Sequence, residues 1–311
     1  MRLRQLRYFK TLAEELHFGN AAEKLHIQQP PLSRQIQSME EDLGVTLFKR
    51  TNRKVELTAE GRYLLKEARE ILSIMDRART RLQAMGDGRA GKLHVSFIYL
   101  ALSSAFPGIV GDFIREYPEV DVSLYDENTY HQINAVKEGT RHVGFVTMKL
   151  LDLLGLESMV VHRSTTCAAI PASHPLAEKD VLTLKDLSEL PYICSTDSYC
   201  RMRVKEMQKI FGAADLELKI GMKYERKHTG NVFVAAGLGW TVINTDSIGT
   251  IPDGIALKQL EIELHPFEIG MIWNPERMTP LVQNFIDFYK GRVGGKNSEL
   301  DVGENSIEIV K

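Results

Sequence analysis

The chain has 311 residues, 43% of them hydrophobic, with 39 Lys and Arg against 41 Asp and Glu and a formal net charge of −2 at pH 7. This length suffices for two or three soluble domains, and no apolar run approaches the ~20 residues that a membrane-spanning helix needs. The three cysteines, Cys167, Cys194 and Cys200, are too few and too scattered for a disulfide framework or a structural zinc site. The basic N-terminus leads into an amphipathic helix rather than an apolar signal core, so we expect a cytoplasmic protein with no membrane partner.

The charge is unevenly distributed along the chain. Residues 1–90 carry 17 Lys and Arg and 12 Asp and Glu, a balance of +5, whereas the remainder carries 22 and 29, a balance of −7. A basic N-terminal part on an acidic body indicates two functions, so the low net charge of the whole chain does not exclude a polyanionic partner for the N-terminal part.

The N-terminal segment predicts three helices. The first, roughly residues 3–16, places Leu6, Phe9 and other apolar residues on one face, where they should pack under the next two helices. The third repeats Leu32 and Ile36 at helical spacing, and the break before it is too short for anything but a turn. Two helices joined this tightly, with polar and cationic residues on the open face of the second, form a helix-turn-helix that can enter a DNA major groove.

The third helix begins at about Gln29, and the prolines in its first turn cost little because the N–H groups there have no intrahelical partner. Gln side chains can bond adenine edges and Arg can bond guanine or phosphate, whereas the cations of the following hairpin suit phosphates or the minor groove. For any single cation, an unbound surface charge is the alternative interpretation. The candidate DNA-binding residues are Gln28, Gln29, Pro30, Pro31, Ser33, Arg34, Gln37, Arg50, Arg53 and Lys54.

This segment resembles the winged helix-turn-helix of the LysR-type transcriptional regulators. The matching residues, at fixed spacing, are Leu6-Arg7-Tyr8-Phe9, Ala21-Ala22, Gln29-Pro30, Leu32-Ser33-Arg34-Gln35-Ile36, Glu40-Glu41-Asp42-Leu43-Gly44, Leu47-Phe48, Arg50 and Leu57-Thr58. The rest of the chain is similar to the family in length and layout, so the resemblance covers all but the C-terminal tail. It implies groove contacts at the N-terminal end of the third helix, although Gln28 stands where the family usually has Ser.

A long helix follows, with Thr58 as its N-cap. Its apolar residues recur at spacings of four and three, which is a heptad seam that needs a partner helix. The alternative is that this helix packs only on its own domain. The resemblance favours a dimer of such helices, assembled further into a dimer of dimers on a two-fold related operator. The seam consists of Leu64, Ala68, Ile71, Met75, Ala78, Leu82 and Met85.

After a glycine-rich hinge at residues 86–91, strands alternate with helices, which predicts an α/β fold with a largely parallel sheet. A second unit of the same kind begins near Val160, and a strand at 267–273 with a closing helix at 279–290 returns to the first. Two crossings predict a bilobed fold like that of periplasmic solute-binding proteins. The expected domains are a winged helix-turn-helix at 1–58, a linker helix and hinge at 59–91, an effector-binding domain at 92–290 (lobe I 92–161 and 266–290, lobe II 162–265) and a disordered tail at 291–311.

A ligand in such a fold binds beyond the carboxyl ends of the strands, near helix N-termini. Thr129-x-x-Gln132 predicts a capping box, and an Arg pair beside a second-lobe helix start favours an anion such as a small carboxylate. Under the resemblance, Thr129 matches a position that contacts the effector in members that sense aromatic acids, whereas those relatives often have a hydroxyl residue where Leu100 stands. The alternative is that Thr129 only caps its helix and that the arginines are solvated. The candidate ligand-binding residues are Leu100, Ser103, Ser104, Thr129, Thr147, Arg201, Met202 and Arg203.

The leading hypothesis is a DNA-binding transcriptional regulator, activator or repressor, controlled by a small-molecule effector between the two lobes. The effector is expected to be a small carboxylate, with aromatic ones included, and no cofactor or metal is expected because no histidine pair has metal-ligand spacing. Double-stranded promoter DNA and further copies of the chain are the expected partners, with RNA polymerase as a further candidate. Two alternatives stay open: a redox-responsive regulator that uses Cys200, and a solute-binding protein without DNA. An enzyme is not expected, since no nucleophile-base arrangement or phosphate-binding glycine loop is present in the sequence.

Overall fold

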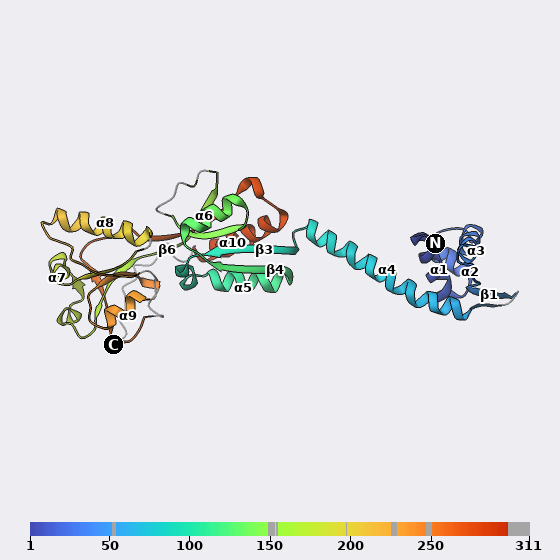
Figure 1. The fold of residues 1–311 in the computed structure, drawn as a ribbon, viewed down its shortest axis with the longest axis horizontal. Helices are drawn as coiled ribbons and strands as arrows, with labels where there is room; N and C mark the ends of the chain where they lie inside the picture. The colour runs from blue at the N-terminus through green and yellow to red at the C-terminus, as the bar shows by residue number, and fades with distance from the viewer. Residues whose placement is uncertain are drawn as a thin grey trace. The chain divides into compact units, whose positions relative to one another are not determined.

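The computed structural model describes residues 1–51, 54–148, 153, 155–196, 198–224, 229–246 and 251–297. The chain divides into two compact units, Met1–Gly86 and Asp87–Lys311 (Figure 1). In the described part of the chain, no helix combines the length and the apolar character needed to cross a bilayer.

The first unit is a three-helix head with a β-hairpin wing and a long helix. Phe9, Leu12, Leu32, Ile36 and Met39 are fully buried and form the centre of its core. Gly44 ends the third helix in the left-handed region at φ 67°, which suits glycine. The elements are α1 (Leu3–Glu15), α2 (Phe18–Lys24), α3 (Gln29–Leu43), the antiparallel pair β1 (Phe48–Thr51) and β2 (Lys54–Leu57), and α4 (Ala59–Gly86).

The apolar seam of α4 divides into two parts with different environments. Near its start, Ala68 and Leu72 are buried and Leu64 and Met75 pack against the core of the head. Farther along, large apolar side chains are exposed, so packing on its own unit accounts for only the first part of the predicted seam. There, Leu82 and Met85 of the predicted seam are exposed. Ile71 and Ile74, which alternate with the buried positions nearer the head, are exposed as well.

The second unit opens with a five-stranded sheet in the order β4-β3-β5-β13-β6, which we term the first lobe together with its helices. β3 pairs in parallel with β4 and β5, whereas β13 pairs antiparallel with β5 and β6. The elements are β3 (Ala90–Phe97), η1 (Tyr99–Ser103), α5 (Phe106–Glu116), β4 (Glu119–Asp126), α6 (Thr129–Glu138), β5 (Val143–Thr147), β6 (Glu157–Ser164), β13 (Phe267–Trp273), η5 (Pro275–Arg277) and α10 (Pro280–Asn297).

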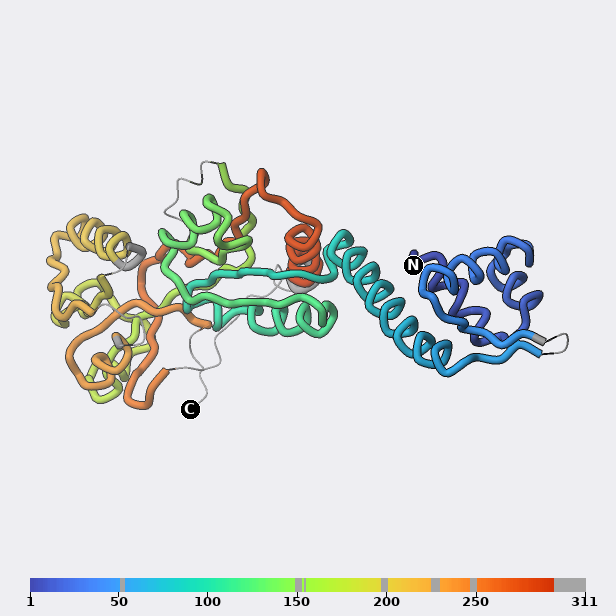
Figure 2. Tube along the Cα trace, turned by 45° about the vertical axis from the view of Figure 1, so that its right-hand side comes forward, coloured from blue at the N-terminus to red at the C-terminus, as the bar shows by residue number. Residues whose placement is uncertain are grey.

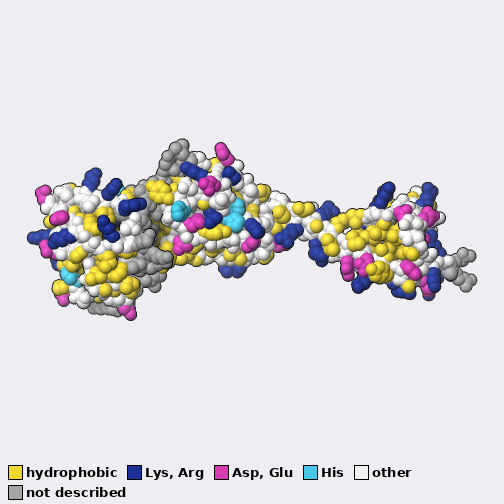
Figure 3. Space-filling model, in the orientation of Figure 1, with side chains coloured by type: hydrophobic (Ala, Val, Ile, Leu, Met, Phe, Trp, Pro, Cys, Tyr) yellow, Lys and Arg dark blue, Asp and Glu magenta, His cyan; other side chains and the backbone are white. Residues whose placement is uncertain are grey.

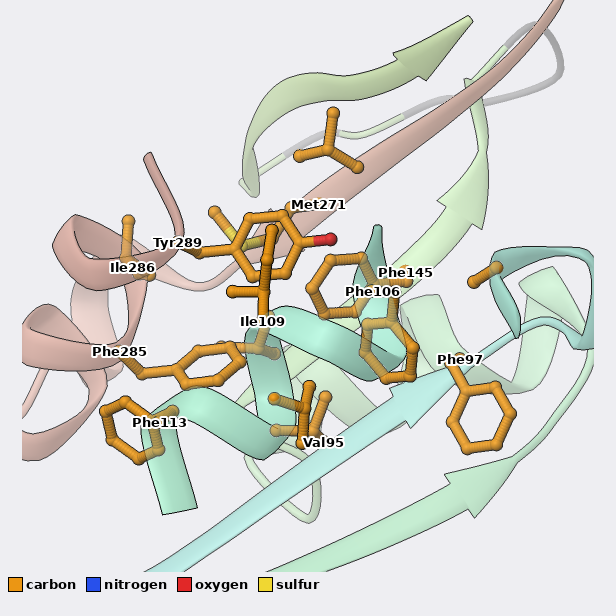
Figure 4. Close-up of a cluster of buried hydrophobic side chains, with 14 of the residues drawn as sticks. Val95, Phe97, Phe106, Ile109, Phe113, Phe145, Met271, Phe285, Ile286 and Tyr289 are labelled. Carbon is orange, nitrogen blue, oxygen red and sulfur yellow. The ribbon is translucent and has the colours of Figure 1, made fainter. Parts of the chain in front are cut away.

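Helices cover both faces of this sheet. Phe106 and Phe113 of α5 and Phe285 of α10 pack with Val95 and Phe145 in one aromatic core (Figure 4). α6 covers the other face, where it packs against β5 and β13. The last helix, α10, therefore lies beside β3, the first strand of the unit, although the two are far apart in sequence (Figure 2).

The second lobe contains β7 (Thr166–Pro171), η3 (Pro175–Glu178), β8 (Val181–Leu182), α7 (Leu184–Ser188), β9 (Tyr192–Ser195), α8 (Ser198–Ala213), β10 (Ile220–Tyr224), α9 (Thr229–Ala235), β11 (Thr241–Asn244) and β12 (Ile255–Leu260). The sheet order is β11-β7-β12-β8, with β9 and β10 as a parallel pair joined to Trp240 by a bridge at Tyr192. β7 pairs antiparallel with both β11 and β12, so the expectation of a largely parallel sheet is wrong for this lobe. β11 and β12 lie on the two sides of β7, and the chain runs through both of them in the direction opposite to that of β7.

The chain crosses between the lobes twice. Pairing within the first-lobe sheet continues to Ser164 opposite Phe267, three residues past the boundary predicted at 161, and β7 of the second lobe then begins at Thr166. At the other end, α10 continues to Asn297, past the predicted end of the closing helix at 290. Residues 298–311, most of the tail expected to be disordered, lie outside the described residues.

Candidate nucleic-acid interface and ligand site

The N-terminal half of α3 presents a polar surface held on an apolar base. Leu32, Ile36 and Met39 are completely buried, which fixes the rotation of the helix about its axis. The opposite face is therefore open to solvent, and Arg34 forms no ion pair with another described residue. Of the predicted DNA-binding residues in this helix and its N-cap, Ser33 is half-buried, and Gln28, Gln29, Pro30, Pro31, Arg34 and Gln37 are exposed.

Glu40 joins α3 to the wing. One of its carboxylate oxygens accepts the N–H groups of Leu47 and Phe48 at 2.8 and 3.1 Å, and the other accepts from Arg50 at 2.8 Å. The Arg50 guanidinium also lies 5.0 Å from the centre of the Phe18 ring. Arg50 thus has a structural role in the wing, and a DNA contact by this side chain would compete with the Glu40 ion pair.

The remaining predicted wing contacts are Arg53 and Lys54. Arg53 lies outside the described residues. The exposed Lys54 forms an ion pair with Glu56, and this contact raises the pKa of Lys54 and lowers that of Glu56. Lys54 is therefore charged at neutral pH, and a DNA contact by this side chain would compete with the Glu56 ion pair.

In the first lobe, five of the predicted ligand-binding residues gather at the carboxyl ends of β3 and β5. Leu100 and Ser103 belong to η1, directly after β3, and both are half-buried. Ser104 instead holds the start of α5, because its hydroxyl donates to the Ala101 carbonyl at 2.7 Å and accepts from the Phe106 N–H at 3.2 Å.

Thr129 and Thr147 complete this group, and both are buried. The Thr129 hydroxyl accepts the backbone N–H of Thr147 at 3.3 Å, so it connects the start of α6 to the end of β5. Helix starts and strand ends thus converge here, as expected for a ligand site in an open α/β sheet.

The predicted capping box at Thr129 is wrong. Asn128 is the N-cap of α6, and its side-chain oxygen accepts the His131 N–H at 3.0 Å. Gln132 points into the lobe, where its amide donates to the Glu127 carbonyl at 2.8 Å and its oxygen accepts from the Ser96 hydroxyl at 3.2 Å. Asn and Thr both serve as N-caps, and here the extended backbone of Asn128 decides between them.

The two predicted arginines of α8 have different environments. Arg201 is exposed, and Met202 is half-buried. Arg203 is buried, with its guanidinium donating to Glu206 at 2.8 Å and to the backbone carbonyl of His265 at 3.1 Å. The alternative that both arginines are solvated is therefore wrong for Arg203, which holds α8 against the segment that returns to the first lobe.

Sequence reasoning missed two cations beside Arg201. Lys205 on α8 and Lys223 on β10 line a cavity of about 380 Å³ with it. Arg201 and Lys205 are four residues apart, which places them on one face of the helix. This spacing is the feature of the sequence that could have indicated Lys205. The contribution of Lys223 depends on strand pairing between β9 and β10, which no local pattern indicates.

Among the described residues, no group of three or more His, Cys, Asp or Glu side chains is arranged to hold a metal ion. Burial raises the pKa of the Cys167 thiol to about 11 and also raises the pKa of Cys194, so both thiols are protonated and weakly reactive at neutral pH. The side chain of Cys200, on which the redox alternative rests, lies outside the described residues.

A winged helix-turn-helix with an open polar recognition face, followed in the same chain by a two-lobed α/β unit, defines a DNA-binding transcriptional regulator with an effector-binding domain. Two family models match the chain in this order. Residues 3–62 match the bacterial regulatory helix-turn-helix protein, lysR family, and residues 86–294 match the LysR substrate binding domain. The chain belongs to the LysR family of transcriptional regulators.

Relatives and solved structures agree with this assignment. The chain is 30% identical over 288 residues to the HTH-type transcriptional regulator IlvR of Caulobacter vibrioides, covering 92% of this chain and 96% of that protein. It is 42% identical over 195 residues to the uncharacterised regulator YnfL of Escherichia coli K12, which covers 61% of this chain and 64% of the relative. The crystal structure of CbnR, a LysR family regulator, superposes with a TM-score of 0.80 at 27% identity, covering 93% of this chain and 100% of that one. Full-length CbnR in complex with its target DNA gives 0.78 at 27% identity, with 94% and 100% covered.

Proposed function

We propose that this regulator binds operator DNA through the exposed N-terminal half of α3 and responds to a small carboxylate bound between its two lobes. The observation that supports DNA contact at α3 is the state of its arginine. Arg34 is exposed with no ion pair in the described part of the chain, whereas Arg50 in the wing is already paired with Glu40. The similarity to CbnR, which was solved in complex with its target DNA, supports DNA binding by this chain.

The test compares Arg34→Ala with Arg79→Ala, which removes an exposed charge from α4 and serves as the matched control. Affinity for promoter DNA is measured by fluorescence anisotropy at several salt concentrations. Loss of Arg34 should weaken binding about tenfold or more and, if it contacts phosphate, reduce the slope of log K against log salt by roughly 0.9. Equal effects of the two substitutions would show that α3 carries no special contact.

A second copy of the chain is the proposed partner of α4. Leu82 and Met85 continue the heptad seam beyond the part that packs on the head, and both are exposed. Ile71 of the seam and the neighbouring Ile74 are also exposed. A row of large apolar side chains on a helix is stabilised when a similar helix covers it. Such pairing sets two recognition helices on one two-fold related operator, and a dimer of dimers extends this arrangement.

The proposed effector site includes the ends of β3 and β5 around Thr129 and Thr147. A hydroxyl and nearby helix N-termini suit a carboxylate, because backbone N–H groups there have no intrahelical partner. Thermal shifts of the full-length protein with benzoate and with succinate, at constant ionic strength, test this site. Thr129→Val should abolish the shift, whereas Thr140→Val, which removes a surface hydroxyl that bonds the Ala135 carbonyl, should preserve it. A shift that survives Thr129→Val would exclude this position from the site.

A further inference from the structure

A cavity of about 380 Å³ lies on the flank of the second lobe, between α8 and the strand pair β9 and β10. Cys194 and Thr196 form its strand side, Lys223 comes from the neighbouring strand, and α8 contributes Arg201, Lys205 and Gln208. All of these residues belong to the second lobe. The cavity therefore needs neither the first lobe nor the first unit to form.

The charge of this cavity is one-sided. Its lining holds Arg201, Lys205 and Lys223 and, among the described residues, no carboxylate. None of the three forms a salt bridge within the described part of the chain, in contrast to the nearby Arg203, which pairs with Glu206. Lys and Arg side chains stand out on the face of this lobe around α8 (Figure 3). Three like charges around one hollow repel each other, and an anion placed among them would relieve that repulsion.

The electrostatic influence of Lys223 extends to the strand beneath it. Its backbone pairs with Cys194 on β9, and the charge of Lys223 opposes the rise in the pKa of the Cys194 thiol that burial causes. Cys194, on the strand side of the cavity, thus lies within the electric field of Lys223, one of the three cations.

We propose that this cavity binds a small, multiply charged oxyanion of the phosphate monoester class, at a site separate from the proposed effector site between the lobes. The volume falls at the lower end of the range for small-molecule sites, which fits a compact ligand. An Arg guanidinium can bond two oxygens of such an anion, and two Lys ammonium groups and the Thr196 hydroxyl add donors from other directions. A single carboxylate offers two oxygens and one charge, which leaves part of this donor set unused.

Isothermal titration of the full-length protein with inorganic phosphate, at constant ionic strength set with chloride, tests the proposal. The wild type should bind phosphate saturably, and Lys205→Gln and Lys223→Gln should each weaken binding by about tenfold, because each removes a charge-assisted contact. Lys209→Gln is the matched control, since Lys209 is an exposed cation on the same helix that does not line the cavity. The control should leave the phosphate affinity unchanged.

The proposal is overturned if the wild type shows no saturable binding below roughly 10 mM phosphate, or if Lys209→Gln weakens binding as much as Lys223→Gln does. Succinate that displaces phosphate with equal affinity would overturn the assignment to phosphates. Thr129→Val should leave phosphate binding unaltered, because Thr129 belongs to the first lobe. A loss of phosphate binding in this variant would place the anion in the effector site and refute a separate cavity, whichever way the carboxylate experiment turns out.

Discussion

Replacement of Arg203 by Met tests how the second lobe holds α8. Arg203 is 4% exposed, so its charge is satisfied almost entirely inside the protein. The guanidinium bonds the Glu206 carboxylate at 2.8 Å and the carbonyl of His265 at 3.1 Å. Arg203→Met keeps much of the aliphatic stem but leaves both acceptors without this donor.

The expected loss follows from the burial of the two partners. Breaking a buried ion pair by removal of one partner costs about 3–5 kcal/mol, because the remaining charge is left uncompensated. The Glu206 side chain is 21% exposed and can regain some water, which places the loss at the lower end. We therefore expect the free energy of unfolding to fall by about 3 kcal/mol, or the Tm of the second unit by roughly 6–12 °C.

Urea denaturation followed by tryptophan fluorescence measures this loss, because Trp240 is completely buried in the same lobe. Arg201→Met, at an exposed position on the same helix, should change the free energy of unfolding by no more than about 0.5 kcal/mol. The double change of Arg203 and Glu206 to Met should recover part of the stability, since no uncompensated charge remains. If Arg203→Met and Arg201→Met were equally mild, the structural role assigned to Arg203 would be refuted.

Three further predictions address other parts of the chain. Leu82→Glu, in the exposed seam of α4, should shift the protein towards monomers in sedimentation velocity, and an unchanged oligomer would count against that seam. Gly88→Ala should lower the free energy of unfolding by about 2 kcal/mol or more in urea titrations, because φ is +68° and the new methyl group would meet the Pro280 backbone at 2.4 Å; a wild-type midpoint would contradict this packing. Burial, with His94 as the smaller cause, lowers the pKa of His142, so the unfolded chain binds a proton first as the pH falls below about 6.5 and stability decreases. His142→Asn should therefore lose less stability than the wild type between pH 7.5 and 5.5 in denaturant titrations, and equal losses would remove His142 as the cause.

Local patterns predicted the helices of the head well, because the spacing of apolar residues there fits a helix and leaves only one of its faces to be buried. Leu32 and Ile36 recur at helical spacing, and the third helix buries both of them. Gly44 also ends the third helix, where the sequence places it. The exposure of Arg34 followed from the same periodicity, since a helix that buries one stripe must present the opposite one to solvent.

Other features could not be read from local patterns. The strand Glu157–Ser164 carries many polar residues, and it is a strand because Phe267–Trp273, far along the chain, pairs with it. The strand Ile255–Leu260 similarly depends on Thr166–Pro171. Arg203 looks like any surface cation in the sequence, and only the packing of its helix encloses it with a carboxylate.

The sequence by itself determined the head, the long helix and the alternation of strands and helices, because these depend on interactions between residues a few positions apart. The tertiary structure alone decided which strands run antiparallel, that Asn128 is the N-cap of α6, and which cations form ion pairs with other described residues. The physical reason is distance along the chain. Periodicity fixes which side of an element is apolar, whereas the partner of a charge or a strand edge is chosen by segments that only folding brings together.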